Sequence, residues 1–131
     1  MGLIKFLVTI SFLTTSINVM AEWTAIAGNS HFTTYIDTDS RQIQGDRVTI
    51  LYMLDYSSIK KRYGSNHMFN SSVIQGDFNC KKQYKRQLDV ILYSENLARG
   101  SVVHAVRNIN EKYISIIPGS IDAGLIKWAC Y

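Results

Sequence analysis

The sequence predicts an α+β fold, in which a six-stranded antiparallel meander sheet is followed by one C-terminal helix. Residues 23–106 consist mostly of short runs rich in β-branched and aromatic residues, separated by turn signals. Only the C-terminal tail has apolar residues at helical spacing. The connections between the runs are short, which favours antiparallel neighbours because parallel crossovers need more chain.

The first 21 residues have the pattern of a cleaved secretory signal. Lys5 supplies a positive start, residues 6–13 are apolar, and residues 19–21 are small or aliphatic, as a signal peptidase requires. The apolar run is shorter than the roughly 20 residues of a membrane-spanning helix, which makes an N-terminal anchor the weaker interpretation. We therefore expect a signal peptide over residues 1–21 and one exported domain over residues 22–131.

Three strands are predicted in the first half of this domain. The first two flank the turn signal Gly28-Asn29-Ser30, and the third begins after a reversal at Gly45-Asp46. The polar stretch before that reversal is interpreted as one irregular or helical turn. The third strand has apolar residues on both faces, which indicates a central, covered strand. The three strands are predicted at residues 23–27, 31–37 and 47–56.

Three more strands are predicted at residues 72–79, 81–93 and 101–106. In the fourth, alternation places Gly76 and Cys80 on one face, and we expect Gly76 to leave room for the helix. If Cys80 faces the helix, the same alternation places Arg86 on the helix side of the fifth strand. Lys81 and Lys85 are then expected on the opposite face.

A short helix is predicted after Pro118. Ser120 is a suitable N-cap, and Asp122 in the first turn complements the helix dipole. Because one short helix is not stable alone in water, we expect its apolar stripe to lie on the sheet. That stripe consists of Ile121, Leu125 and Trp128.

The chain has two cysteines, Cys80 and Cys130, and an even count in an exported protein favours a disulfide. A bond between them would attach the C-terminal helix to the sheet, and closing this loop contributes roughly 4 kcal/mol in the chain-entropy description. Metal binding is the alternative, but there is no CxxC pair and none of the three histidines lies near a cysteine in sequence. We expect neither a metal nor a cofactor.

The composition argues against several function classes. At 47% apolar and 18% charged residues, with one proline, the chain is an ordinary globular domain rather than a disordered one. Neither a nucleophile elbow nor a metal-ligand helix motif occurs, so no catalytic residues are assigned. His31 and His104 lie in predicted strands and are interpreted as packed or partly exposed. The net charge is +4, and +3 without Lys5, which makes nucleic acid a poor candidate for an exported chain.

Basic residues gather in two stretches of the sequence. Residues 58–68 are predicted to form an exposed basic loop, and a second basic run begins directly after Cys80. Together they would form a positive patch for an acidic partner. The alternative is a set of solubilising residues at strand ends, where lysine also discourages aggregation. The residues of the proposed binding patch are Lys60, Lys61, Arg62, Lys81 and Lys85.

Several short motifs occur together along the whole mature chain. They are Glu22-Trp23, Tyr35-Ile36-Asp37, Ser40-Arg41, Gly45-Asp46, Asp55-Tyr56, Phe78-Asn79-Cys80, Tyr84, Arg86, Tyr93-Ser94, and Pro118-Gly119-Ser120 to Trp128-Ala129-Cys130. With them the chain resembles the surface-adhesin protein E family of Gram-negative bacteria, and the paired cysteines are the most specific element. The resemblance implies a helix held on the concave face of a six-stranded antiparallel sheet by a Cys80–Cys130 disulfide.

The resemblance also implies a function. Better-studied members of that family are lipid-anchored surface proteins that bind host matrix and plasma proteins and can dimerise. Here no cysteine follows Ala21, so no lipid anchor is expected, and residence in the periplasm competes with residence at the cell surface. We expect a secreted, non-enzymatic binding module with a protein partner and a capacity to form homodimers. The alternative is a periplasmic envelope-associated structural protein or hydrolase inhibitor without adhesin activity.

Overall fold

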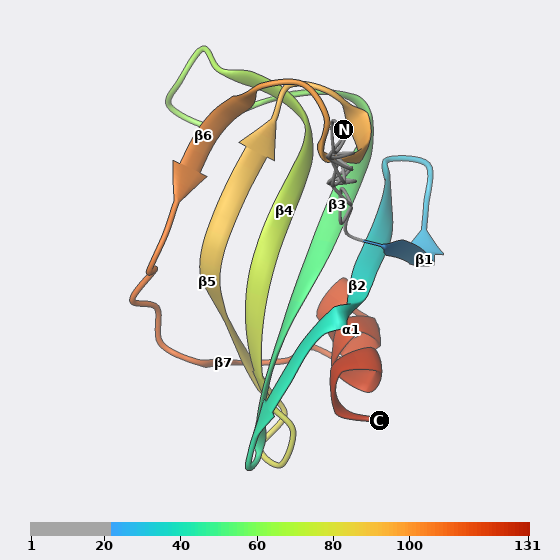
Figure 1. Cartoon of the computed structure of the whole chain (residues 1–131), viewed down its shortest axis with the longest axis vertical. Coiled ribbons are helices and arrows are strands. Elements are labelled where there is room, and N and C mark those ends of the chain that lie inside the picture. The colour runs from blue at the N-terminus through green and yellow to red at the C-terminus, as the bar shows by residue number, and fades with distance from the viewer. Residues whose placement is uncertain (1–21) are drawn as a thin grey trace, which may run out of the picture.

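The computed structural model describes residues 22–131, so the predicted signal peptide lies outside the described residues. Six antiparallel strands pair in chain order, which confirms the predicted meander (Figure 1). A two-residue strand, β7 (Ile114–Ser115), pairs with the start of β5, and one helix, α1 (Ile121–Cys130), ends the chain. The six strands are β1 (Trp23–Gly28), β2 (Phe32–Gln44), β3 (Arg47–Lys61), β4 (Met68–Asn79), β5 (Tyr84–Tyr93) and β6 (Val102–Val106).

Strands β2, β3 and β4 are longer than the sequence predicts. Strand β3 continues to Lys61, which pairs with Met68, so residues 58–61 are strand and only residues 62–67 form the loop. The ring of Tyr56 packs edge-on against the rings of Phe32 and Phe69, and this aromatic cluster extends the sheet beyond the predicted end. The predicted irregular turn before Gly45 is likewise part of β2, in the form of a register shift between Asp37 and Gln42.

The main hydrophobic core lies between α1 and one face of the sheet, which we call the helix face. Ser120 caps the helix as predicted, because its hydroxyl accepts a hydrogen bond from the Ala123 amide at 3.3 Å. Of the predicted apolar stripe, only Leu125 is buried, whereas Ile121 and Trp128 remain 40% and 47% exposed. The buried core residues are Ile36, Val48, Ile50, Tyr52, Ile74, Phe78, Leu125, Ile126 and Ala129.

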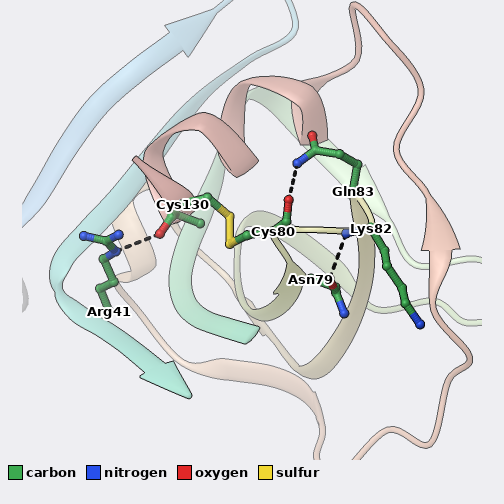
Figure 2. Close-up of a disulfide and its surroundings, with 7 residues drawn as sticks. Arg41, Asn79, Cys80, Lys82, Gln83 and Cys130 are labelled. Carbon is green, nitrogen blue, oxygen red and sulfur yellow. Dashed lines mark hydrogen bonds between the residues drawn. A yellow bond between two sulfur atoms is a disulfide. The ribbon is translucent and has the colours of Figure 1, made fainter. Parts of the chain in front are cut away.

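The C-terminal helix is fixed at its last turn. A disulfide joins Cys80 to Cys130 with the two Cα atoms 5.7 Å apart, which confirms the predicted pairing (Figure 2). Beside it, Arg41 Nε donates a hydrogen bond of 2.7 Å to the Ala129 carbonyl, one of the unpaired acceptors at the helix end. These two links fix the rotation of α1, which is why Ala129 rather than Trp128 faces the core.

Gly76 lies in the middle of the helix face, but the helix is not what approaches it. A Cβ atom at this position would lie 2.8 Å from the Phe78 ring and 3.0 Å from the Tyr52 ring. The space that Gly76 leaves is therefore occupied by aromatic rings of the sheet itself. The sequence-based expectation that the helix uses this space is wrong.

Candidate functional site

The basic residues predicted to form one patch are divided between the two ends of the sheet. Lys60, Lys61 and Arg62 lie at the β3–β4 hairpin, while Lys81 lies in the turn from β4 to β5 at the opposite end (Figure 1). The twelve residues of β4 separate the two groups, a length of roughly 40 Å for an extended strand. They do not form a continuous surface.

Lys85 lies on the helix face. The prediction that it lies on the opposite face is wrong. It pairs in register with Phe78, and its ammonium group forms an ion pair with Asp122 of α1. Two features cause the change. Residues 80–83 form a turn, in which Gln83 has a φ of +57°, and the register shifts between Gln75 and Gly76. A shift of one residue exchanges the two faces of a strand.

The side chains around the β4–β5 turn hold its shape. The Asn79 carboxamide oxygen accepts a hydrogen bond of 2.9 Å from the Lys82 amide, and Gln83 Nε2 donates one of 2.7 Å to the Cys80 carbonyl (Figure 2). The side chains of Lys81 and Lys82 are exposed. This turn therefore presents two cations on a rigid backbone next to the disulfide.

The β3–β4 hairpin, residues 60–67, is a second basic element at the surface of the sheet. The Arg62 amide donates to the His67 carbonyl at 2.9 Å, which closes the loop. The Tyr63 side chain at its tip is fully exposed, and Lys61 is exposed beside it. Lys60 is half-buried, with its ammonium group 5.7 Å from the centre of the Tyr56 ring. The hairpin thus combines cations with an unburied aromatic ring.

A buried ionic cluster surrounds Asp77, whose side chain has no exposed area. Its Oδ2 atom accepts hydrogen bonds from Arg47 Nη2 at 2.6 Å, Arg86 Nε at 2.8 Å and Tyr113 Oη at 2.6 Å. Arg86 is opposite Asp77 in the sheet register, so it lies on the face away from the helix, contrary to the predicted alternation. Its guanidinium also stacks 4.5 Å from the centre of the Tyr113 ring.

The charges of this cluster suit a structural role rather than a catalytic one. Burial alone would raise the pKa of Asp77, but the hydrogen bonds from Arg47, Tyr113 and Arg86 outweigh it and lower the pKa below its ordinary value. The same contact with Asp77 raises the pKa of Arg47. A carboxylate that stays ionised and is enclosed by its own partners is unsuited to proton transfer with a substrate. Asp77 therefore joins three strands to the segment that leads to β7.

The histidines do not form a metal centre. His31 is exposed before β2, whereas His104 of β6 is half-buried, and its ring centre lies 6.5 Å from that of His67. Within residues 22–131, no group of three or more His, Cys, Asp or Glu side chains has an arrangement suited to a metal ion. In the same part of the chain, no helix has the length and apolar character that crossing a membrane requires.

The sheet face opposite the helix, which we call the open face, contains an apolar groove that sequence reasoning missed. Its floor is formed by Leu51, Val73 and Ile91, and its volume is 770 Å³. In the sequence, the apolar residues on both faces of the third strand were the one indication of an apolar surface here. The aromatic walls could not be predicted, because they come from strands far apart in sequence. Those walls are Trp23, Tyr35 and Tyr93.

Comparisons with known proteins agree with this architecture. The sequence profile of the family described as "Surface-adhesin protein E" matches residues 23–131. No curated protein sequence gives a significant match. The crystallised protein E of Haemophilus influenzae is similar in fold, with a TM-score of 0.64, 16% identity, and 90% of each chain covered. Protein E from non-typeable Haemophilus influenzae gives a TM-score of 0.61 and 16% identity, with 86% of this chain and 77% of that chain covered.

The family match spans the whole described domain, including both cysteines and the helix that they anchor. The sheet order, the C-terminal helix and the disulfide agree with the fold that the sequence motifs imply. The chain therefore belongs to the surface-adhesin protein E family.

Proposed function

We propose that the protein is a secreted, non-enzymatic adhesin that binds a host matrix or plasma protein through the β3–β4 hairpin. Family membership supports an adhesin-like surface protein. The protein partner and the hairpin as its binding site are our proposal. The observation that supports the hairpin is the combination of Lys61, Arg62 and a fully exposed Tyr63 on a closed loop.

The residue types of the hairpin suit protein recognition. Tyrosine and arginine are enriched among the residues that contribute most to protein interfaces, because both combine a large apolar surface with hydrogen-bonding groups. Cations on the hairpin would attract an acidic partner and speed its approach. The β4–β5 turn offers a comparable charge in Lys81 and Lys82 but no fully exposed aromatic ring. We therefore assign recognition to the hairpin and keep Lys81 as the site for comparison.

Reversing the hairpin charges should weaken binding. In the K61E/R62E double variant, we expect affinity for immobilised basement-membrane extract or plasma proteins to fall by at least about tenfold, since charge reversal replaces attraction with repulsion. The salt dependence of the remaining affinity should become flatter. Surface plasmon resonance at several salt concentrations measures both effects.

The matched control is K81E/K82E, which makes the same change of charge at the other end of the sheet. Its affinity should stay within about twofold of the wild type, because the separation far exceeds the screening length of roughly 8 Å. Lys85 is unsuitable for this comparison, since its replacement would also break the ion pair with Asp122. Equal losses in both variants, or a loss only in the control, would overturn the hairpin assignment.

An adhesin must be accessible from outside the cell. We expect protease added to intact cells to degrade the protein, while a periplasmic marker stays intact. Cleavage inside the exposed hairpin, at Lys61 or Arg62, would identify that loop as reachable. Protection in intact cells followed by cleavage after permeabilisation would reject the adhesin role and favour an envelope-associated periplasmic protein.

A further inference from the structure

The groove on the open face has the features of a site for a small ligand. It is concave, its volume of 770 Å³ lies in the range of ligand pockets, and its lining is mostly aliphatic and aromatic. The aliphatic floor comes from the three central strands β3, β4 and β5, through Leu51, Val73 and Ile91. Rigid strands fix such a floor more firmly than loops would.

One wall of the groove is a loop held in a strained backbone conformation. Leu97 and Ala98, which both line the groove, are consecutive residues with φ values of +57° and +55°. This left-handed region is unfavourable for residues with a Cβ atom. The sequence places no glycine at either position, so other contacts must enforce the conformation.

Two side chains of the sheet hold this loop. Asp55 Oδ1 accepts hydrogen bonds from the Leu97 amide at 2.8 Å and from Asn96 Nδ2 at 2.9 Å. The buried hydroxyl of Ser71 accepts one from the Ala98 amide at 2.9 Å and donates one to the Glu95 carbonyl at 2.6 Å. The wall is therefore built before any ligand arrives, as expected for a preorganised site.

The charges at the groove are cationic. Arg99 and Arg107 both line it, and Arg99 forms no ion pair within residues 22–131. Arg107 is 63% exposed, and its single ion-pair contact, with Asp89, is long at 3.8 Å. Each guanidinium group lies beside the apolar floor, and either one matches a ligand that has an anionic head on an apolar body.

The sheet also disfavours an extended peptide as the occupant. The backbone groups of β3, β4 and β5 are already paired with neighbouring strands over the groove floor. In a peptide lying across this face, the amides turned toward the floor would lose water without gaining a partner, which costs free energy. A hydrocarbon chain has no such groups.

We propose that this groove binds a long-chain acyl carboxylate, with the chain on the aliphatic floor and the carboxylate at one of the two arginines, Arg99 or Arg107, which flank opposite ends of β6. The site is separate from the β3–β4 hairpin to which protein binding is assigned. It therefore stands or falls independently of the adhesin function.

Trp23 provides a direct reporter of this site. The chain has two tryptophans, and the W128F variant leaves only Trp23, which lines the groove. Cis-parinaric acid, a fluorescent polyene fatty acid that absorbs where tryptophan emits, should quench Trp23 in purified exported protein in a saturable way. Unlabelled oleate should reverse the quenching by competition.

The contribution of the carboxylate is tested with an ester and with a charge variant. Methyl oleate should compete roughly tenfold more weakly than oleate, because its uncharged ester oxygens accept weaker hydrogen bonds from arginine than a carboxylate does. In R99Q/R107Q, oleate should weaken to the level of the ester. The control K81Q/K82Q makes an equal change of net charge at the opposite end of β5 and should bind like the parent. K61E/R62E should also retain oleate binding.

Several results would overturn the proposal. Quenching that does not saturate, equal competition by acid and ester, or unchanged binding in a correctly folded R99Q/R107Q variant would each reject it. Circular dichroism establishes the folding of each variant. Analytical sedimentation tests whether a second copy of the chain occupies the groove instead. A dimer that oleate neither dissociates nor enters would show that it does.

Discussion

Replacing Asp77 by asparagine should lower the free energy of unfolding by about 3 kcal/mol, because it removes the charge of a fully buried carboxylate and leaves the partly exposed Arg47 and Arg86 without their counterion. Asp77 has no exposed area, and one of its oxygens accepts from Arg47, Arg86 and Tyr113. An asparagine has the same shape but no charge, so its one carbonyl oxygen can accept only weaker hydrogen bonds from the two guanidinium groups. Urea unfolding followed by circular dichroism measures the loss.

Two variants place this value in context. D89N alters a carboxylate on the same sheet face whose ion-pair partner, Arg107, is 3.8 Å away and largely exposed. The asparagine oxygen can still accept the hydrogen bond from the Asn108 amide, so the cost should stay below about 1 kcal/mol. Y113F removes one hydrogen bond to Asp77 and should cost about 1 kcal/mol. If D77N proves no more costly than D89N, the cluster around Asp77 does not stabilise the fold.

The same carboxylate makes stability depend on pH in a defined direction. The pKa of Asp77 is lower in the folded protein than in the unfolded chain, so the folded state binds its proton less readily. Its contribution is therefore complete above the unfolded pKa of about 4 and is lost as the pH falls through the folded value. The difference in stability between the wild type and D77N should shrink in acid. A difference that grew as the pH fell would contradict this assignment.

The sequence was sufficient for the architecture because its signals were local. The β-branched runs, the turn at Gly45 and the N-cap at Ser120 each describe a few neighbouring residues, and each is confirmed. The prediction of the disulfide needed only two observations, an even cysteine count and an N-terminal pattern typical of a secretory signal. These features together determine the sheet order and the position of the helix.

The features that sequence reasoning missed depend on register between strands. The register shift opposite Gly76 brings Lys85 to the helix face. No residue type in β5 predicts that register shift. The partners of Asp77 come from two other strands and the segment before β7, so their meeting requires the finished fold. No glycine in the sequence indicates the positive φ values of Leu97 and Ala98. Hydrogen bonds to Asp55 and Ser71, which lie in other strands, enforce that backbone conformation instead.

Removal of the disulfide is the second change with a large expected effect. The bond closes a loop with a sequence separation of 50, and its loss in C80S/C130S should lower the free energy of unfolding by roughly 4 kcal/mol, through the greater freedom of the unfolded chain. In a domain of this size, such a loss is a large fraction of the total stability. Urea unfolding compares the variant with the oxidised wild type.

The helix should respond more strongly than the sheet. The bond attaches α1 to the sheet, and without it the helix is held by the Lys85–Asp122 ion pair, the Arg41 hydrogen bond and the packing of its apolar residues. Amide exchange in residues 121–130 should therefore accelerate more than exchange in β3 and β4, since local opening no longer requires the sheet to unfold. The variant R41Q isolates the other link, because it loses the hydrogen bond to Ala129 but keeps the disulfide, and should cost about 1 kcal/mol. Uniform acceleration across the sheet and helix would instead mean that the helix is an inseparable part of one cooperative core.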